Sequence, residues 1–185
     1  MTTWRPDFNP EHLYFVTTKA VKYAHLFQRD VMKRLIVDNL DCFRAQKRIK
    51  LYTFVIMPNH IHIIIQCRPD DPPPDVLRDF KKRTSDRIVR HYQAEGNQEV
   101  LDFLASAVTR PEKQTHKVWE EGYHAEDVFS PRFLRQKIIY SHNNPCQPRW
   151  ALVERPEDYL WSSARFYLLG HPAIMPLDNA NELLA

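Results

Sequence analysis

The stretch LYTFVIMPNHIHIIIQ, residues 51–66, decides the fold of this chain. It contains two apolar, β-prone runs, Leu51–Met57 and His60–Gln66, and only Pro58 and Asn59 separate them. Two such runs joined by a short turn of proline and asparagine are typical of a tight antiparallel hairpin. The sequence therefore predicts a pair of neighbouring strands here.

The second run carries two histidines, His60 and His62, among isoleucines. Side chains alternate along a strand, so both imidazoles leave by one face, about 6–7 Å apart at their Cα atoms. That spacing allows the two rings to bind one divalent ion. A hydrogen-bonded, half-buried pair without a metal has the same pattern, so the histidines alone leave both interpretations open.

Strands and helices alternate on both sides of the hairpin. Apolar residues recur at helical spacing within Arg29–Arg48 and again from Val76 to Tyr92. His12–Thr18 and His116–His124 are predicted as further strands, whereas residues 93–116 include a polar stretch without a predicted structure. The order βαββαβ predicts an α+β protein with a ferredoxin-like antiparallel sheet and its helices on one face.

A further helix is predicted to begin at Ser130-Pro131, because serine caps free amides and proline is tolerated at the first helical position. Gln136, Tyr140 and Asn144 share one of its faces. A tyrosine on a helix is most often a packing residue. Combined with a histidine pair that binds a metal, however, its hydroxyl can attack a phosphodiester, and nearby Lys137 would favour the developing phenolate.

Length and composition indicate one domain spanning residues 1–185, with a core of about 12–145 and a helical tail of about 146–185. No apolar run has the length of a membrane span, and the first residues lack a secretory signal, which favours a cytoplasmic protein. The three cysteines are widely spaced and suggest neither a disulfide framework nor a zinc site.

Positive charge is concentrated in two segments. Residues 78–92 hold six basic and two acidic side chains, and residues 132–155 hold five basic and one acidic, a net charge of +4 in each against +3 for the whole chain. Such segregation fits surfaces that face phosphates, although a solvated helix face has the same composition.

Four stretches together resemble the HUH single-tyrosine transposases of bacterial insertion sequences, particularly the REP-associated branch. They are Tyr14-Phe15-Val16-Thr17-Thr18, Met57-Pro58-Asn59-His60-Ile61-His62, Tyr140-Ser141-His142-Asn143-Asn144-Pro145 and the tail segment from Leu152 to Arg165 with Trp161-Ser162-Ser163. The resemblance covers residues 12 to 170. Ser141 departs from it, since an apolar residue is more usual there.

The resemblance implies a nickase and strand transferase that cuts single-stranded DNA beside imperfect hairpins. His60 and His62 would hold Mg²⁺ or Mn²⁺, and Tyr140 would attack the phosphate to leave a 5′-phosphotyrosyl link and a free 3′-hydroxyl. Imidazole ligands favour Mn²⁺ over Mg²⁺. The third ligand is expected to be Asn144, with His142 as the rival, while Asn144 could instead cap the helix end.

DNA contacts are expected from basic residues in both charged segments and the tail, and Trp161 is expected in the core. A monomer with its tyrosine acting in cis is favoured over a dimer with the tyrosine supplied in trans. A hairpin-binding protein that no longer cleaves, and an unrelated metalloenzyme using only the histidines, are the alternatives. The expected DNA contacts are Lys81, Lys82, Arg83, Arg87, Lys137, Arg149 and Arg165.

Overall fold

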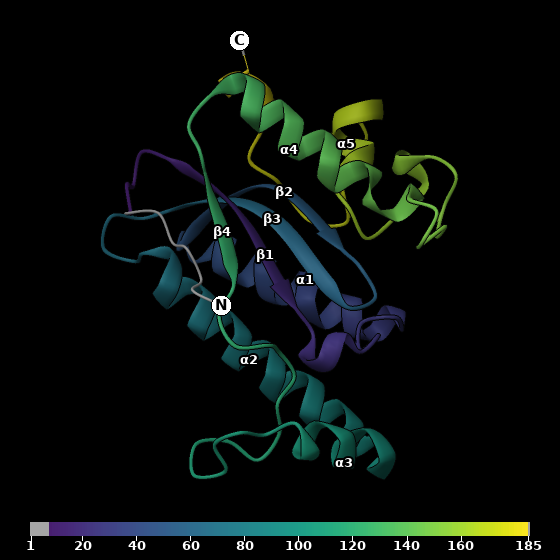
Figure 1. Ribbon diagram of the computed structural model, residues 1–185. Helices are drawn as coiled ribbons and strands as arrows, with labels where there is room; N and C mark the ends of the chain where they lie inside the picture. Colours follow the sequence, from purple (N-terminus) through teal and green to yellow (C-terminus); the bar gives the residue numbers. More distant parts are fainter. Residues whose placement is uncertain (1–7, 185) are drawn as a thin grey trace.

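The computed structural model describes residues 8–184 and shows a four-stranded antiparallel sheet in the order β2-β3-β1-β4 (Figure 1). This is the ferredoxin-like arrangement that the sequence predicts. The strands and helices are β1 (Leu13–Lys19), α1 (Asp30–Ala45), β2 (Ile49–Ile56), β3 (His60–Cys67), α2 (Pro73–Ala94), α3 (Gln98–Ser106), β4 (His124–Val128), α4 (Pro131–Asn143) and α5 (Ala164–Leu169).

The predicted hairpin is present as β2 and β3. Its strands pair up to Ile56 opposite Ile61, and the Met57 amide donates to the His60 carbonyl oxygen at 2.8 Å to close the turn. Ile61, Ile63 and Ile65 then lie on one face of the sheet, and the two histidines on the other. The alternation of the sequence thus separates a packing face from a face that carries polar side chains.

The isoleucine face is covered by α1 and α2. Met32, Ile36 and Leu40 of α1 and Phe80 of α2 are buried against it in the larger hydrophobic core. Burial of each such side chain stabilises the fold by about 1.5–3 kcal/mol. The helical spacing in the sequence predicts that α1 and α2 pack on the sheet, because it places the apolar residues on one side of each helix.

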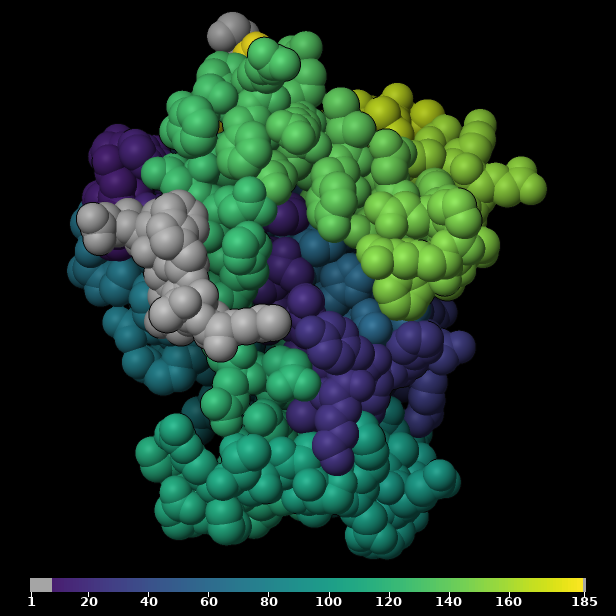
Figure 2. Space-filling view, in the orientation of Figure 1, coloured from purple at the N-terminus to yellow at the C-terminus, as the bar shows by residue number. Residues whose placement is uncertain are grey.

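The opposite face of the sheet is covered by α4. Leu134 and Ile138 of this helix pack on Phe15 of β1 and Ile64 of β3 in a second, smaller core. In the space-filling view, α4 and the tail form the upper part of the molecule in green and yellow-green, and the purple atoms of β1 and the segment after it lie below them (Figure 2). The predicted helices on one face are therefore α1 and α2, and the tyrosine helix lies on the other.

The fourth strand differs from its predicted position. It is β4, His124–Val128, and the predicted segment His116–His124 makes only an isolated bridge, Trp119 to Ala20. Trp119 packs against Phe27 and its indole N–H donates to Thr84 at 2.9 Å, so its apolar character serves the helix-side core. The stretch without a predicted structure contains α3.

The tail closes the free edge of β2. The Ile56 amide donates to the Trp161 carbonyl oxygen and the Ser163 amide to that of Phe54, both at 2.9 Å. Trp161 is buried as expected, with its indole N–H bonded to Asp30 at 2.9 Å. The tail thus occupies hydrogen-bonding groups that would otherwise template a second strand. No described helix is long and apolar enough to cross a membrane.

Candidate active site

His60 and His62 lie side by side on β3, facing α4. Their ring centroids are 4.8 Å apart, and both side chains are almost fully buried. In the sheet, His62 is opposite Thr17 of β1 and His60 is opposite Lys19. The strand alternation predicted from the sequence therefore does bring the two imidazoles together.

Hydrogen bonds at Nδ1 orient both rings. The His60 Nδ1 lies 2.7 Å from Asn59 Oδ1, an oxygen that can only accept, so this nitrogen carries the proton and Nε2 keeps a free lone pair. The His62 Nδ1 lies 2.7 Å from the Thr17 hydroxyl, which can hold that ring in the same tautomer. Second partners of this kind are typical of metal-binding histidines.

Burial also keeps both rings neutral. It is the main cause that lowers the pKa of His60 to about 4, with a smaller contribution from the Arg149 charge. Burial and the neighbouring His60 lower the pKa of His62 to about 2. The neutral imidazole is the form that binds a metal ion, so neither ring has to lose a proton at neutral pH before it can act as a ligand.

Asn144 completes the candidate ligand set. Its side chain is fully buried, with its amide nitrogen 3.2 Å from His62 Nε2, and its Oδ1 has no hydrogen-bond partner. A buried carbonyl oxygen without a partner is costly, and a flip of the amide would turn Oδ1 toward the His62 lone pair. No three histidine, cysteine or carboxylate side chains gather into a metal site within residues 8–184. Two imidazoles and this amide oxygen are the side-chain groups at this place that could hold a divalent cation.

His142, the rival third ligand, lies elsewhere. Its Nε2 is 2.8 Å from the Ser163 hydroxyl, and its ring packs on Tyr167 of α5. His142 joins α4 to the tail, and the structure brings Asn144, not His142, next to His62. This agrees with the helical spacing, because His142 is two positions from Asn144 and so lies on the opposite side of α4 from the face that Tyr140 and Asn144 share.

Tyr140 reaches the histidines from α4. The Ser130 hydroxyl caps this helix by accepting from the Phe133 amide at 3.2 Å, as predicted. The Tyr140 ring centroid lies 5.3 Å from that of His62, and the side chain is 41% exposed. A partly exposed tyrosine beside a neutral imidazole can reach a phosphate bound at the same place.

Glu126 is a site residue that the sequence did not reveal. Its carboxylate pairs with the Lys137 ammonium at 2.6 Å, and that ammonium lies 4.6 Å from the centre of the Phe15 ring. The pair joins β4 to α4 one turn before Tyr140. This pair could not be found from the sequence, because the fourth strand was predicted at His116–His124 and Glu126 was therefore not placed in the sheet.

Comparison with known proteins places this geometry in a family. The family described as "Transposase IS200 like" matches residues 11–104, just over half of the chain. The chain belongs to the IS200-like transposase family. The matched region contains the histidine pair and ends before Tyr140.

One solved structure shares the fold of this chain. The structure of a REP-associated tyrosine transposase bound to a REP hairpin is 17% identical, with a TM-score of 0.61, over 96% of this chain and 93% of that one. A putative transposase from Deinococcus radiodurans R1 is 20% identical, with a TM-score of 0.44, over 76% of this chain and 96% of that one. The comparison with curated proteins found no match.

The predicted DNA contacts fall on two separate surfaces. Arg149 lines a cleft of about 490 Å³ together with Trp150, whose ring centroid lies 5.7 Å from that of His60. Lys137 lies beside Tyr140 but is already paired with Glu126. Arg165 is half-buried on α5. The α2 residues lie on the face of the sheet that α1 and α2 cover, so the sheet separates them from Tyr140. Their contacts with DNA stay a prediction, for a surface distinct from the candidate active site. These α2 residues are Lys81, Lys82, Arg83 and Arg87.

Two of these α2 side chains already have partners. The Lys81 ammonium donates to the carbonyl oxygens of Glu120 and Gly122, and the Arg87 guanidinium pairs with Asp38 at 3.2 Å. Lys82 and Arg83 are exposed. Contacts from α2 to phosphate therefore fall more readily to Lys82 and Arg83.

Acid should destabilise the protein partly through His142. Burial lowers the pKa of His142 to about 4, whereas an unfolded histidine titrates near pH 6.5. The unfolded chain therefore binds the proton first, so this contribution to stability is complete above about pH 6.5 and is lost as the pH falls toward 4. From pH 7 to pH 5 the loss should be about 2 kcal/mol.

This loss is measured by urea unfolding of wild type and His142→Gln at both pH values in EDTA. The variant should lose about 2 kcal/mol less than wild type between them, since His60 and His62 contribute equally to both proteins. Equal losses would contradict a neutral, buried His142.

Proposed function

We propose that this transposase is a metal-dependent single-stranded DNA endonuclease and strand transferase that acts at hairpins through Tyr140. The observation that carries the proposal is the contact of Tyr140 with His62, 5.3 Å between ring centroids, on the one face of the sheet where neutral imidazoles and an unpaired amide oxygen meet. A tyrosine nucleophile and a metal-binding pair are the two parts that this reaction needs.

The Tyr140 oxygen attacks the scissile phosphorus, the bond from phosphorus to the 3′-oxygen breaks, and the 3′-oxygen takes up a proton. The tyrosine proton leaves as the phosphotyrosyl bond forms on the 5′ side. In the reverse step a 3′-hydroxyl attacks the same phosphorus and releases the tyrosine, so strands rejoin without ATP. The number of phosphodiester bonds is conserved in the exchange.

His60, His62 and Asn144 would hold the Mg²⁺ or Mn²⁺ ion. When bound, this ion polarises the phosphate and stabilises charge on the leaving oxygen. Two imidazole ligands favour Mn²⁺. Thr17 and Asn59 orient the rings from behind, and the Glu126–Lys137 pair keeps α4, and so Tyr140, at a fixed distance from the sheet.

Hairpin DNA of the REP type is the proposed substrate. The similar solved structure is bound to a REP hairpin, and the likeness extends over the tail as well as the sheet. In this chain the tail supplies Arg149 next to the histidine pair. These observations support an assignment to the REP-associated branch.

We also propose that the tyrosine acts in cis in a monomer. Tyr140 and His62 of the same chain are already in contact. Trp161 and Ser163 cover the outer edge of β2, which leaves no free β2 edge for pairing with a second copy. A dimer that exchanges its tyrosine helices would have to break the contact of Tyr140 with His62 within each chain.

The test is to incubate the protein with labelled single-stranded hairpins from the DNA flanking its own gene, with Mn²⁺ or with EDTA. We expect a covalent protein–DNA adduct that resists denaturation and forms only with the metal. If several flanking hairpins bind but none forms an adduct with Mn²⁺ or with Mg²⁺, the result would favour a protein that binds hairpins without cleaving them.

A further inference from the structure

The segment after β1 holds an exposed tyrosine in a strained backbone. Lys22 and Tyr23 have φ angles of 51° and 53°, a left-handed conformation that side chains other than glycine rarely adopt. The Tyr23 side chain is nevertheless 59% exposed, so packing of the ring in a core does not explain the strain. Strained residues that persist at a surface are concentrated at functional sites.

Hydrogen bonds connect this tyrosine to the histidine pair. The Asn59 amide nitrogen donates to the Tyr23 carbonyl oxygen at 3.1 Å, and Asn59 Oδ1 accepts from His60 Nδ1 at 2.7 Å. A single asparagine thus fixes both the strained turn and the orientation of His60. The backbone that carries the exposed ring is thereby tied to the residue that orients His60.

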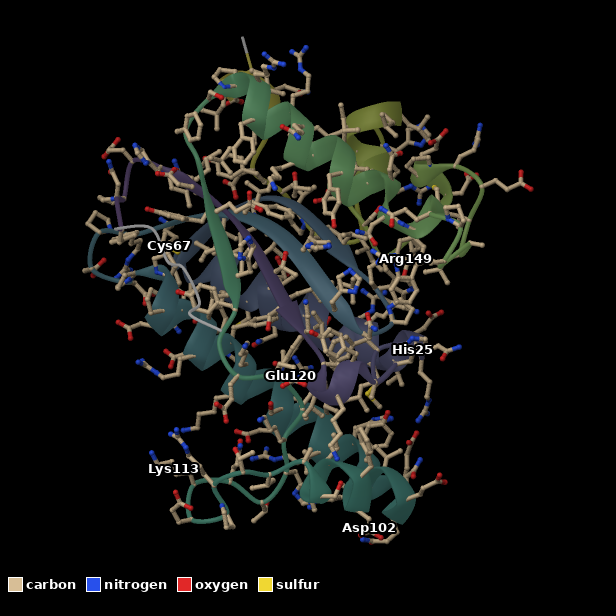
Figure 3. All side chains as sticks on the ribbon, in the orientation of Figure 1. His25, Cys67, Asp102, Lys113, Glu120 and Arg149 are labelled. Atoms are coloured by element: carbon tan, nitrogen blue, oxygen red, sulfur yellow. The ribbon has the colours of Figure 1, made fainter. Side chains whose placement is uncertain are left out.

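The charges around the ring are basic. The Lys19 ammonium lies 5.0 Å from the centre of the Tyr23 ring, and Lys19 is opposite His60 in the sheet, on the same face. Arg149 lies on the same side of the molecule as His25 (Figure 3), and both line a cleft with Trp150, whose ring centroid is 5.7 Å from that of His60. The one carboxylate found in this segment's hydrogen bonds, Glu120, accepts from the Lys22 amide at 2.6 Å.

We propose that Tyr23 is a stacking platform for one unpaired base of the DNA strand whose phosphate reaches Tyr140, and that Lys19 contacts the adjoining phosphate. This inference rests on the proposed function. Single-strand binding combines an aromatic face with cations along the backbone, and only an unpaired base exposes a free face for stacking. The fixed turn presents the ring without a loss of backbone freedom on binding.

The test measures hairpin affinity in a Tyr140→Phe background, where no covalent adduct can trap the DNA. We expect Tyr23→Ala to weaken binding about 5- to 100-fold and Tyr23→Phe to keep wild-type affinity, because stacking needs the ring and not the hydroxyl. Leu168→Ala is the matched control, since it removes a similarly exposed apolar side chain, 55%, from α5. Lys19→Gln should make hairpin affinity less dependent on salt, by the change in slope that corresponds to about one phosphate contact.

A fluorescent base analogue, 2-aminopurine, locates the stacked base when it is placed in turn at each unpaired position near the cleavage site. At one position the fluorescence should be quenched by the protein with Tyr23 and by Tyr23→Phe, and it should recover with Tyr23→Ala. Unchanged affinity and unchanged quenching in Tyr23→Ala, while wild type still forms the adduct, would overturn this inference and leave the proposed function intact. Base-specific quenching without an adduct from wild type would support the platform and overturn the cleavage.

Discussion

Tyr140→Phe should abolish the covalent protein–DNA adduct completely, while hairpin affinity stays within about twofold of wild type. The substitution removes only the attacking oxygen. The phenyl ring keeps its contacts with His62 and with Phe15, whose centroid is 6.0 Å away. The measurements are denaturing gel electrophoresis of labelled hairpin with Mn²⁺ and a parallel binding titration.

The same variant tests whether the tyrosine acts in cis. Tyr140→Phe mixed with His62→Ala should form the adduct no faster than His62→Ala alone, because each chain lacks one part of its own site. Recovery of the adduct in the mixture would show that helices are exchanged between copies. An adduct formed by Tyr140→Phe alone would mean that another residue is the nucleophile.

His62→Ala should lower the rate of adduct formation by about three orders of magnitude at saturating DNA. Lewis-acid stabilisation of the leaving oxygen supplies several kcal/mol, and each 1.36 kcal/mol changes the rate about tenfold. His62 is the ring nearest both Tyr140 and Asn144, so its loss removes a ligand at the point where the nucleophile meets the metal. Calorimetry with Mn²⁺ should show weaker metal binding by the variant.

His142→Gln is the matched control for this experiment. His142 is as deeply buried as His62, but it bonds Ser163 on the tail side. We expect this variant to keep its affinity for Mn²⁺ and its rate, at a temperature where unfolding shows it to be folded. A large loss of metal affinity in His142→Gln, with none in Asn144→Ala, would reverse the choice of third ligand.

Much of the fold follows from local patterns in the sequence. The β2–β3 hairpin, helices α1 and α2 and the Ser130 cap of α4 are encoded by alternation, helical spacing and a single capping residue, all within a few neighbouring positions. The predicted position of β4 was wrong. Val118 and Trp119 are buried against the helices and not in a strand, and the pattern of apolar residues in the sequence does not distinguish the two kinds of burial.

The sequence by itself determined that His60 and His62 share a face and that Tyr140 lies on a capped helix. Only the tertiary structure decided that this helix covers the histidine face, that Asn144 and not His142 meets His62, and that Glu126 pairs with Lys137. The reason is the range of the interactions. Strand and helix periodicity act between neighbours in the chain, whereas the site joins β3, β4 and α4 across 82 positions from His62 to Asn144, and only the packing of α4 on the sheet brings them together.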